Sequence, residues 1–154
     1  MKTNLLALLF IFFISCGDDA EPVDFVSLND KEIQDYLVEN DLQAEKTTSG
    51  LYYIIESEGS GVQPTRTDQV RVAYKGYFTN ANVFDQSPSE GISFNLQQVI
   101  GGWTEGITYF KEGGSGMLVV PSHLGYGSQD YKGIPGGSVL IFEINLIEVN
   151  GSAN

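Results

Sequence analysis

Apolar and polar residues alternate along much of the chain from about residue 47 onward. In the segment 70–75 the even positions are apolar and the odd positions mostly are not, which predicts a half-buried strand. The segment 140–146 alternates in a similar way. Between them the spacing becomes helical, with apolar residues at Val99, Ile100, Trp103, Ile107 and Phe110. Strands outnumber helices, so the pattern predicts an α+β fold with a helix covering one face of an antiparallel sheet.

A second helical pattern precedes the strands, over residues 29–46. Asn29 can cap its start, as the first residue of a capping box. Ile33, Tyr36 and Leu37 then recur at helical spacing, while acidic residues occupy most of the remaining surface. The apolar face is expected to dock either on the folded domain or on a second copy of the chain.

Residues 1–15 have the features of a secretory signal peptide. A positive charge at Lys2 precedes an unbroken apolar run from Leu5 to Ile14, which is shorter than the roughly 20 residues of a membrane-spanning helix. Cys16, the only cysteine, follows directly. The segment Phe13-Ile14-Ser15-Cys16 resembles the lipobox of bacterial lipoproteins, which implies cleavage before Cys16 and lipid on that residue. An ordinary signal peptide with an incidental cysteine is the alternative.

Charge and composition argue against several kinds of function. The 154-residue chain has a net charge of -12, and binding a nucleic-acid backbone needs a Lys/Arg patch. Most of the acidity lies in residues 17–45, where ten acids and one lysine give -9. Residues 16–28, which overlap this acidic stretch, are expected to form an acidic tether. A single Cys with a single His excludes an intrachain disulfide and a Cys/His zinc site. His123 is interpreted as a surface histidine rather than a general base.

Aromatic residues accompanied by single polar residues mark the candidate site. They come from separate predicted elements and are Tyr74, Phe84 next to Asp85, Phe94, Trp103, Tyr126 and Phe142. A hydrophobic core would explain most of them. Two features favour a binding site. Asp85 places a carboxylate beside the apolar Phe84, and Tyr126 lies between two glycines, a loop context in which an aromatic seldom serves packing alone.

Seven short motifs that include these residues occur in the order and spacing of one enzyme family. They are Val72-Ala73-Tyr74-Lys75-Gly76, Phe84-Asp85-Gln86-Ser87, Phe94-Asn95-Leu96, the segment 99–106, the segment 121–127, Gly133-Ile134-Pro135 and the segment 140–146. Together they resemble an FKBP-type peptidyl-prolyl cis-trans isomerase over residues 47–150. The resemblance implies a twisted antiparallel β-sheet wrapped around one short α-helix, here Val99 to Phe110, with the N-terminal helix as an extension.

The resemblance also implies a role for each candidate residue. The catalytic residues would be Trp103 as the floor of a pocket for the substrate proline, Tyr126 as a hydrogen-bond donor to the substrate carbonyl, and Asp85 at the pocket edge. The other substrate-binding residues would be Tyr74, Phe84, Phe94, Val99, Ile100 and Phe142 as walls and Ile134 at the rim. Catalysis would stabilise the twisted Xaa-Pro amide selectively, with no metal and no cofactor.

The expected activity is therefore isomerisation of Xaa-Pro bonds in exported proteins. The expected partners are proline-containing polypeptides, macrolide inhibitors and, through lipid on Cys16, a membrane. The expected location is the bacterial cell envelope, in the outer membrane facing the periplasm or the cell surface. Two alternatives stay open. One is an FKBP-fold chaperone or peptide-binding module with little turnover, and the other is a structural lipoprotein whose aromatic residues form only a core.

Overall fold

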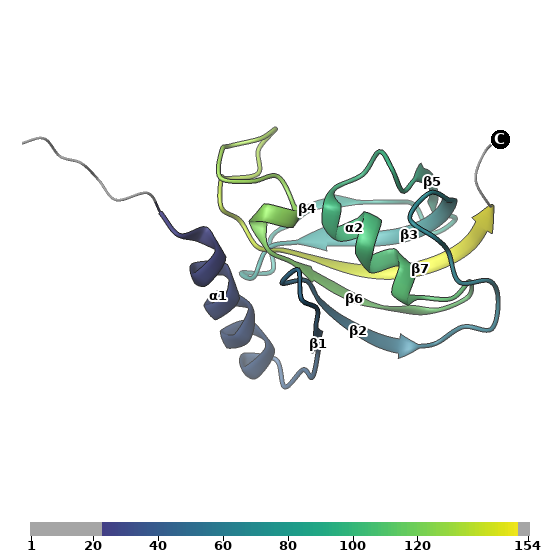
Figure 1. Ribbon diagram of the computed structural model, residues 1–154, viewed down its shortest axis with the longest axis horizontal. Coiled ribbons are helices and arrows are strands. Elements are labelled where there is room, and N and C mark those ends of the chain that lie inside the picture. Colours follow the sequence, from purple (N-terminus) through teal and green to yellow (C-terminus); the bar gives the residue numbers. More distant parts are fainter. Residues whose placement is uncertain (1–22, 151–154) are drawn as a thin grey trace, which may run out of the picture.

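A seven-stranded antiparallel sheet forms the body of the protein in a computed structural model, which describes residues 23–150 (Figure 1). The strands lie in the order β1-β2-β6-β7-β3-β4, and β5 also pairs with β3. In chain order the elements are α1 (Phe25–Glu39), β1 (Glu45–Lys46), β2 (Tyr52–Ser57), β3 (Gln69–Tyr77), β4 (Val83–Gln86), β5 (Ile92–Asn95), α2 (Gly101–Gly106), η1 (Ile107–Tyr109), β6 (Ser115–Val120), η2 (Ser122–Leu124) and β7 (Leu140–Asn150). The predicted α+β fold is confirmed.

The predicted signal peptide over 1–15, the lipidation site Cys16 and the first part of the tether lie outside the described residues. Within residues 23–150, none of the helices has the length and apolar character needed to cross a membrane.

Helix α2 packs closely on one face of the sheet because glycines face strand β6. A Cβ atom on Gly102 would lie 2.5 Å from Cγ1 of Val120, and one on Gly106 would lie 2.6 Å from Cδ2 of Leu118. Neither distance is compatible with a larger residue, so the two glycines set the separation of helix and strand. The contact belongs to a hydrophobic cluster in which Ile107, directly after the helix, has no exposed surface.

The helix predicted over 99–110 is shorter in the structure. Ile100 is the N-cap of α2 and has extended backbone, with φ -60° and ψ 150°. After α2 the chain continues as the 3₁₀ helix η1, and Phe110 is again extended. Val99, Ile100 and Phe110 nevertheless pack in or against the same hydrophobic cluster. Their spacing indicated a longer helix because extended segments at both ends of α2 direct apolar side chains to the core that α2 also faces.

Helix α1 covers the opposite face of the sheet (Figure 1). Its buried apolar residues Ile33, Tyr36 and Leu37 form a second hydrophobic cluster with residues of the strands and the segment before β7. Those residues are Tyr52, Tyr77, Met117, Val119, Val139 and Ile141. The sequence left open whether this apolar helix face docks on the folded domain or on a second copy of the chain. In the structure it docks on the domain.

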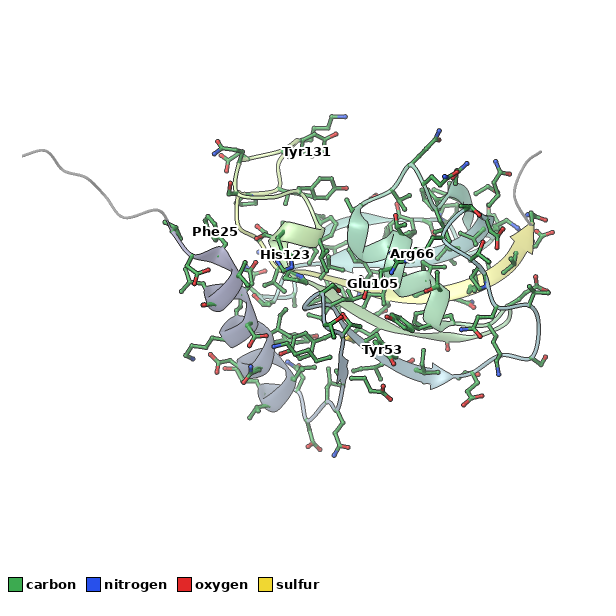
Figure 2. The ribbon with its side chains drawn as sticks, in the orientation of Figure 1. Phe25, Tyr53, Arg66, Glu105, His123 and Tyr131 are labelled. Atoms are coloured by element: carbon green, nitrogen blue, oxygen red, sulfur yellow. The ribbon has the colours of Figure 1, made fainter. Side chains whose placement is uncertain are left out.

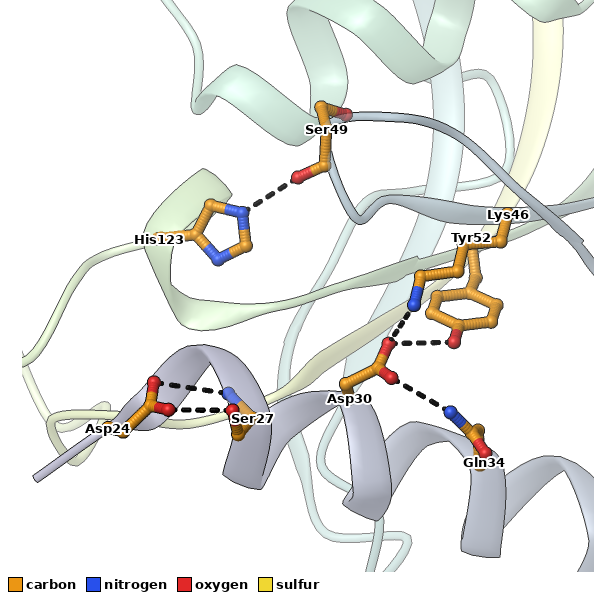
Figure 3. A network of polar contacts seen from close by, with 8 residues as sticks. All are labelled: Asp24, Ser27, Asp30, Gln34, Lys46, Ser49, Tyr52 and His123. Atoms are coloured by element: carbon orange, nitrogen blue, oxygen red, sulfur yellow. Dashed lines mark hydrogen bonds and ion pairs between the residues drawn. The ribbon is translucent and has the colours of Figure 1, made fainter.

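A polar contact joins α1 to the first two strands (Figure 3). The Asp30 carboxylate accepts hydrogen bonds from the Tyr52 hydroxyl at 2.8 Å, from the Lys46 ammonium and from the Gln34 amide at 2.8 Å. The Lys46 and Tyr52 bonds, in that order, hold the pKa of Asp30 below its usual value. The carboxylate therefore remains charged at neutral pH and keeps these donors.

The start of α1 differs from the prediction. The helix begins at Phe25, inside the segment 16–28 expected to be a tether, and Asp24 is its N-cap. The Asp24 carboxylate accepts hydrogen bonds from the backbone N–H groups of Val26 at 3.1 Å and Ser27 at 3.2 Å. Asn29 is not the cap, because it lies inside the helix and its buried side chain has partners elsewhere in the domain.

The helix also ends at Glu39 instead of residue 46. Asp41 has a left-handed φ of 53°, its N–H donates to the Val38 carbonyl, and the Leu42 N–H donates to the Leu37 carbonyl at 2.8 Å. These two bonds form a Schellman motif, which satisfies the last carbonyls and turns the chain away from the helix axis. Strand β1 can then pair with β2.

Replacing Ile33 with alanine is expected to lower the free energy of unfolding by about 2–5 kcal/mol, because Ile33 has no exposed surface between α1 and the sheet. Val38→Ala on the same helix is the control. Val38 is 81% exposed, so its change is expected to stay within about 0.5 kcal/mol. Urea unfolding followed by circular dichroism measures both. Equal effects of the two variants would contradict the docking of α1.

Candidate active site

A cavity of about 820 Å³ lies between α2, strands β3, β4, β5 and β7, and the loop that joins η2 to β7. All ten residues that the sequence motifs indicated line this aromatic pocket. They are Tyr74, Phe84, Asp85, Phe94, Val99, Ile100, Trp103, Tyr126, Ile134 and Phe142. The fold therefore brings residues that are up to 68 positions apart into one site. Their individual roles in catalysis remain predictions.

Trp103 lies at the centre of the aromatic side chains and is only 4% exposed. Its ring meets the rings of three neighbours edge to face, with centroid distances of 5.1 Å to Tyr74, 5.2 Å to Phe94 and 5.4 Å to Phe142. Helix α2 orients Trp103, whose backbone N–H donates to the carbonyl of Ile100 at 2.9 Å. The indole Nε1 is buried and has no hydrogen-bond partner among the described residues.

Asp85 holds the Tyr74 ring in the wall of the pocket. The Tyr74 hydroxyl donates to Oδ2 of Asp85 at 2.6 Å, across the pairing of β3 with β4. The backbone N–H of Tyr74 donates to the Ser87 hydroxyl at 2.9 Å, so strand and side chain are both fixed. Burial, and next the hydrogen bond to Asp85, raises the pKa of Tyr74 well above its ordinary value. Tyr74 is therefore neutral at physiological pH.

Tyr126 faces the pocket from the loop between η2 and β7, hereafter the rim loop (residues 125–139). The Tyr126 ring stacks on the ring of Tyr131 in the same loop, with the ring centroids 4.8 Å apart and an angle of 11° between the ring planes. Tyr131 is labelled in Figure 2. Burial is the main cause that raises the pKa of Tyr126, and the neighbouring Tyr131 and the Asp85 carboxylate raise it further. Tyr126 is 38% exposed, and its phenol stays protonated at neutral pH, so it can donate a hydrogen bond to a bound carbonyl.

His123 lies outside the residues that line the pocket. It is exposed, and its ring Nε2 is 2.8 Å from the carbonyl oxygen of Ser49 (Figure 3). The interpretation as a surface histidine is confirmed. In the part of the chain from 23 to 150, no group of three or more His, Cys, Asp or Glu is arranged to hold a metal ion.

A family model described as FKBP-type peptidyl-prolyl cis-trans isomerase matches residues 60–147. The chain belongs to the FKBP family. Among its relatives are the FKBP-type isomerases FkpA of Buchnera aphidicola subsp. Baizongia pistaciae, 47% identical over 108 residues, and of Escherichia coli K12, 43% identical over 107 residues. These matches cover 69% and 68% of this chain but 43% and 40% of those proteins. The chain thus spans less than half the length of these curated relatives.

Two solved structures have a similar fold. The crystal structure of FkpA from Escherichia coli matches with a TM-score of 0.74 at 34% identity, covering 83% of this chain and 62% of that chain. A peptidyl-prolyl isomerase from Pseudomonas syringae pv. tomato matches with a TM-score of 0.70 at 27% identity, covering 81% of this chain and 96% of that chain. Both structural matches extend beyond residues 60–147.

Six residues of this FKBP-family pocket were not identified from the sequence. They are Phe78, Val83, Gln98, Tyr131, Lys132 and Gly133. Tyr131 and Lys132 belong to the rim loop, and the Lys132 ammonium lies 5.2 Å from the centroid of the Tyr131 ring. The only sequence feature that could have identified Tyr131 and Lys132 as pocket residues is their position between Tyr126 and Ile134. A loop that carries two pocket residues tends to bring the residues between them to the same opening.

Removing the Asp85 carboxylate is expected to lower the pKa of Tyr74 while leaving it above the ordinary value of about 10, because burial is the larger cause of the shift. Tyr53 provides the contrast. Its pKa is raised to about 12 mainly by donating to Glu45, so Glu45→Ala should remove most of that shift. NMR titration of tyrosine labelled at the ring carbon bearing the hydroxyl measures both. A Tyr74 pKa at its ordinary value in Asp85→Ala would contradict the burial of this ring.

Proposed function

We propose that this chain catalyses cis-trans isomerisation of Xaa-Pro bonds. The observation that carries the proposal is the aromatic pocket, in which the nearly buried Trp103 is surrounded edge to face by three rings and Tyr126 presents a neutral phenol at the opening. A proline ring is apolar and compact, and such a pocket fits it better than it fits a charged or extended side chain. Membership of the FKBP family supports the same activity.

The chemistry follows from the nature of the barrier. An unassisted Xaa-Pro bond isomerises over tens to hundreds of seconds, because rotation breaks amide resonance. The planar amide is the more polar form and is favoured by water, whereas the twisted amide has lost its resonance dipole. Moving the bond from water to the aromatic walls around Trp103 therefore disfavours the planar form more than the twisted form. That difference lowers the barrier without a nucleophile.

Tyr126 and Asp85 act as positioning groups in this mechanism. The Tyr126 phenol donates to a substrate carbonyl and fixes one side of the bond while the other side rotates. Asp85 accepts from Tyr74 at 2.6 Å and keeps that ring against Trp103, so the wall does not move with the substrate. Since the pKa values of Tyr74 and Tyr126 are both raised, these hydroxyls remain donors throughout the neutral range.

The expected result of a cis-to-trans assay on a short Xaa-Pro peptide is acceleration by the wild-type chain. Tyr126→Phe should lower kcat/KM by about 2- to 10-fold, the effect of one hydrogen bond of about 0.5–1.5 kcal/mol. Trp103→Ala should lower it by at least about tenfold, because it removes the pocket floor.

The matched control is Tyr53→Phe, which also removes one phenolic hydroxyl, but from a tyrosine outside the pocket whose hydroxyl donates to Glu45. Its kcat/KM should equal that of the wild type. Peptide binding without acceleration would favour the alternative of a peptide-binding module with little turnover. Competition by a macrolide inhibitor of this enzyme class would be further support for the pocket as the site.

We further propose that the protein acts on exported polypeptides from a lipid anchor in the bacterial cell envelope, in the outer membrane facing either the periplasm or the surface. The support is in the sequence, where an apolar run of ten residues is followed by the only cysteine, Cys16. The acidic segment 17–45 would then keep the domain away from an anionic membrane surface, because like charges repel.

Expression of the full chain in a bacterial host with labelled palmitate should give a labelled, membrane-associated protein. Cys16→Ser should lose both the label and the membrane association, since the lipid is attached to that residue. The substitution should leave isomerase activity unchanged, which separates anchoring from catalysis. A Cys16→Ser protein that retains label would contradict the anchor.

A further inference from the structure

Asn29 of α1 is the most buried polar side chain of the helix, with 2% of its surface exposed. Its amide Nδ2 donates to the carbonyl oxygen of Gly137 at 2.8 Å, and its Oδ1 accepts from the backbone N–H of Ser122 at 2.8 Å. These partners are 108 and 93 residues away in sequence. They lie just before and near the end of the rim loop, so one side chain connects its two ends.

The contact is part of a closed ring of four hydrogen bonds. The Ser122 N–H donates to Asn29, the Gly127 N–H donates to the Ser122 carbonyl at 2.8 Å, the Gly137 N–H donates to the Gly127 carbonyl at 2.8 Å, and Asn29 donates to the Gly137 carbonyl. Gly127 is the residue directly after Tyr126. The ring therefore fixes the backbone that carries the pocket phenol.

An apolar contact at the start of α1 reinforces this ring of four hydrogen bonds. The start of the helix lies next to the rim loop (Figure 1). The ring of Phe25, labelled in Figure 2, packs so closely on Gly137 that a Cβ atom there would lie 1.9 Å from its Cε1 atom. Gly137 also has a φ of +78°, a left-handed conformation that suits glycine. The sequence of the loop is thus adapted to a helix from outside the region matched by the family model.

We propose that Asn29 is a positioning residue for prolyl isomerisation, which holds the rim loop so that Tyr126 and Ile134 face the proline pocket. The inference rests on the proposed function. Losing the amide would leave the Ser122 N–H and the Gly137 carbonyl without partners in a buried place, and such groups are stable only if they find water. The loop must then move outward, and Tyr126 moves with it.

The test compares Asn29→Ala with Asn40→Ala in the full chain. Asn40 is the matched control because its amide also donates to a carbonyl, that of Tyr36 at 2.8 Å, but at the other end of α1. Asn29→Ala should lower kcat/KM for an Xaa-Pro peptide by about tenfold, as displacement of a substrate-positioning group does. Asn40→Ala should match the wild type. Native-state hydrogen exchange should be faster at the Gly127 and Gly137 amides in Asn29→Ala and unchanged within β6 and β7.

A double-mutant cycle distinguishes positioning from a general structural effect. If Asn29 acts through Tyr126, then adding Asn29→Ala to Tyr126→Phe should lower kcat/KM by less than the tenfold that it causes alone. Full additivity, or wild-type kcat/KM in Asn29→Ala, would overturn the inference. If the alanine variant is not fully folded at the assay temperature, Asn29→Asp gives the same readouts. It keeps the shape and the acceptor for Ser122 but cannot, as a carboxylate, donate to Gly137.

Failure of this inference is distinguishable from failure of the proposed function. A wild-type chain that does not accelerate isomerisation contradicts the function, whereas an active wild type with an equally active Asn29→Ala variant contradicts the inference alone.

Discussion

The close contact between α2 and β6 determines where the other parts of the pocket lie. Gly102 and Gly106 allow the helix to approach Val120 and Leu118 at distances that any side chain would prevent. Trp103, between them in sequence, then lies within edge contact of rings from β3, β5 and β7. A wider separation of helix and strand would lift the indole away from these rings, and the cavity would lose its floor. The pocket is therefore a consequence of two glycines that do not themselves line it.

The same sheet is buried on both faces, which makes α1 part of the domain. Strand β7 has consecutive buried apolar residues because Leu140 and Phe142 belong to the cluster around α2, while Ile141 belongs to the cluster around α1. Simple alternation of buried and exposed residues is found in sheets that face water on one side. Its interruption at Ile141 is explained by the helix, which supplies Ile33 and Leu37 to cover the outer face.

The fold class and the ten pocket residues could be predicted from the sequence, because the motifs that carry them have fixed order and spacing. The limits of α1 could not. Asp24 and Asn29 are both good N-caps by local chemistry, and the choice between them depends on Ser122 and Gly137, about a hundred residues further on. Tyr131 and Lys132 were missed for a similar reason. Their place at the pocket depends on the path of the rim loop, which hydropathy patterns do not encode.

Trp103 is the only tryptophan of the chain, and the fold places it at the bottom of the cavity, away from solvent. Its indole N–H is buried without a hydrogen-bond partner among the described residues. Indole emission depends on the polarity around the ring, so a molecule that enters the pocket is expected to change the tryptophan emission, all of which comes from this one residue. The chain thus contains an intrinsic optical reporter of pocket occupancy, and no added label is needed to follow it.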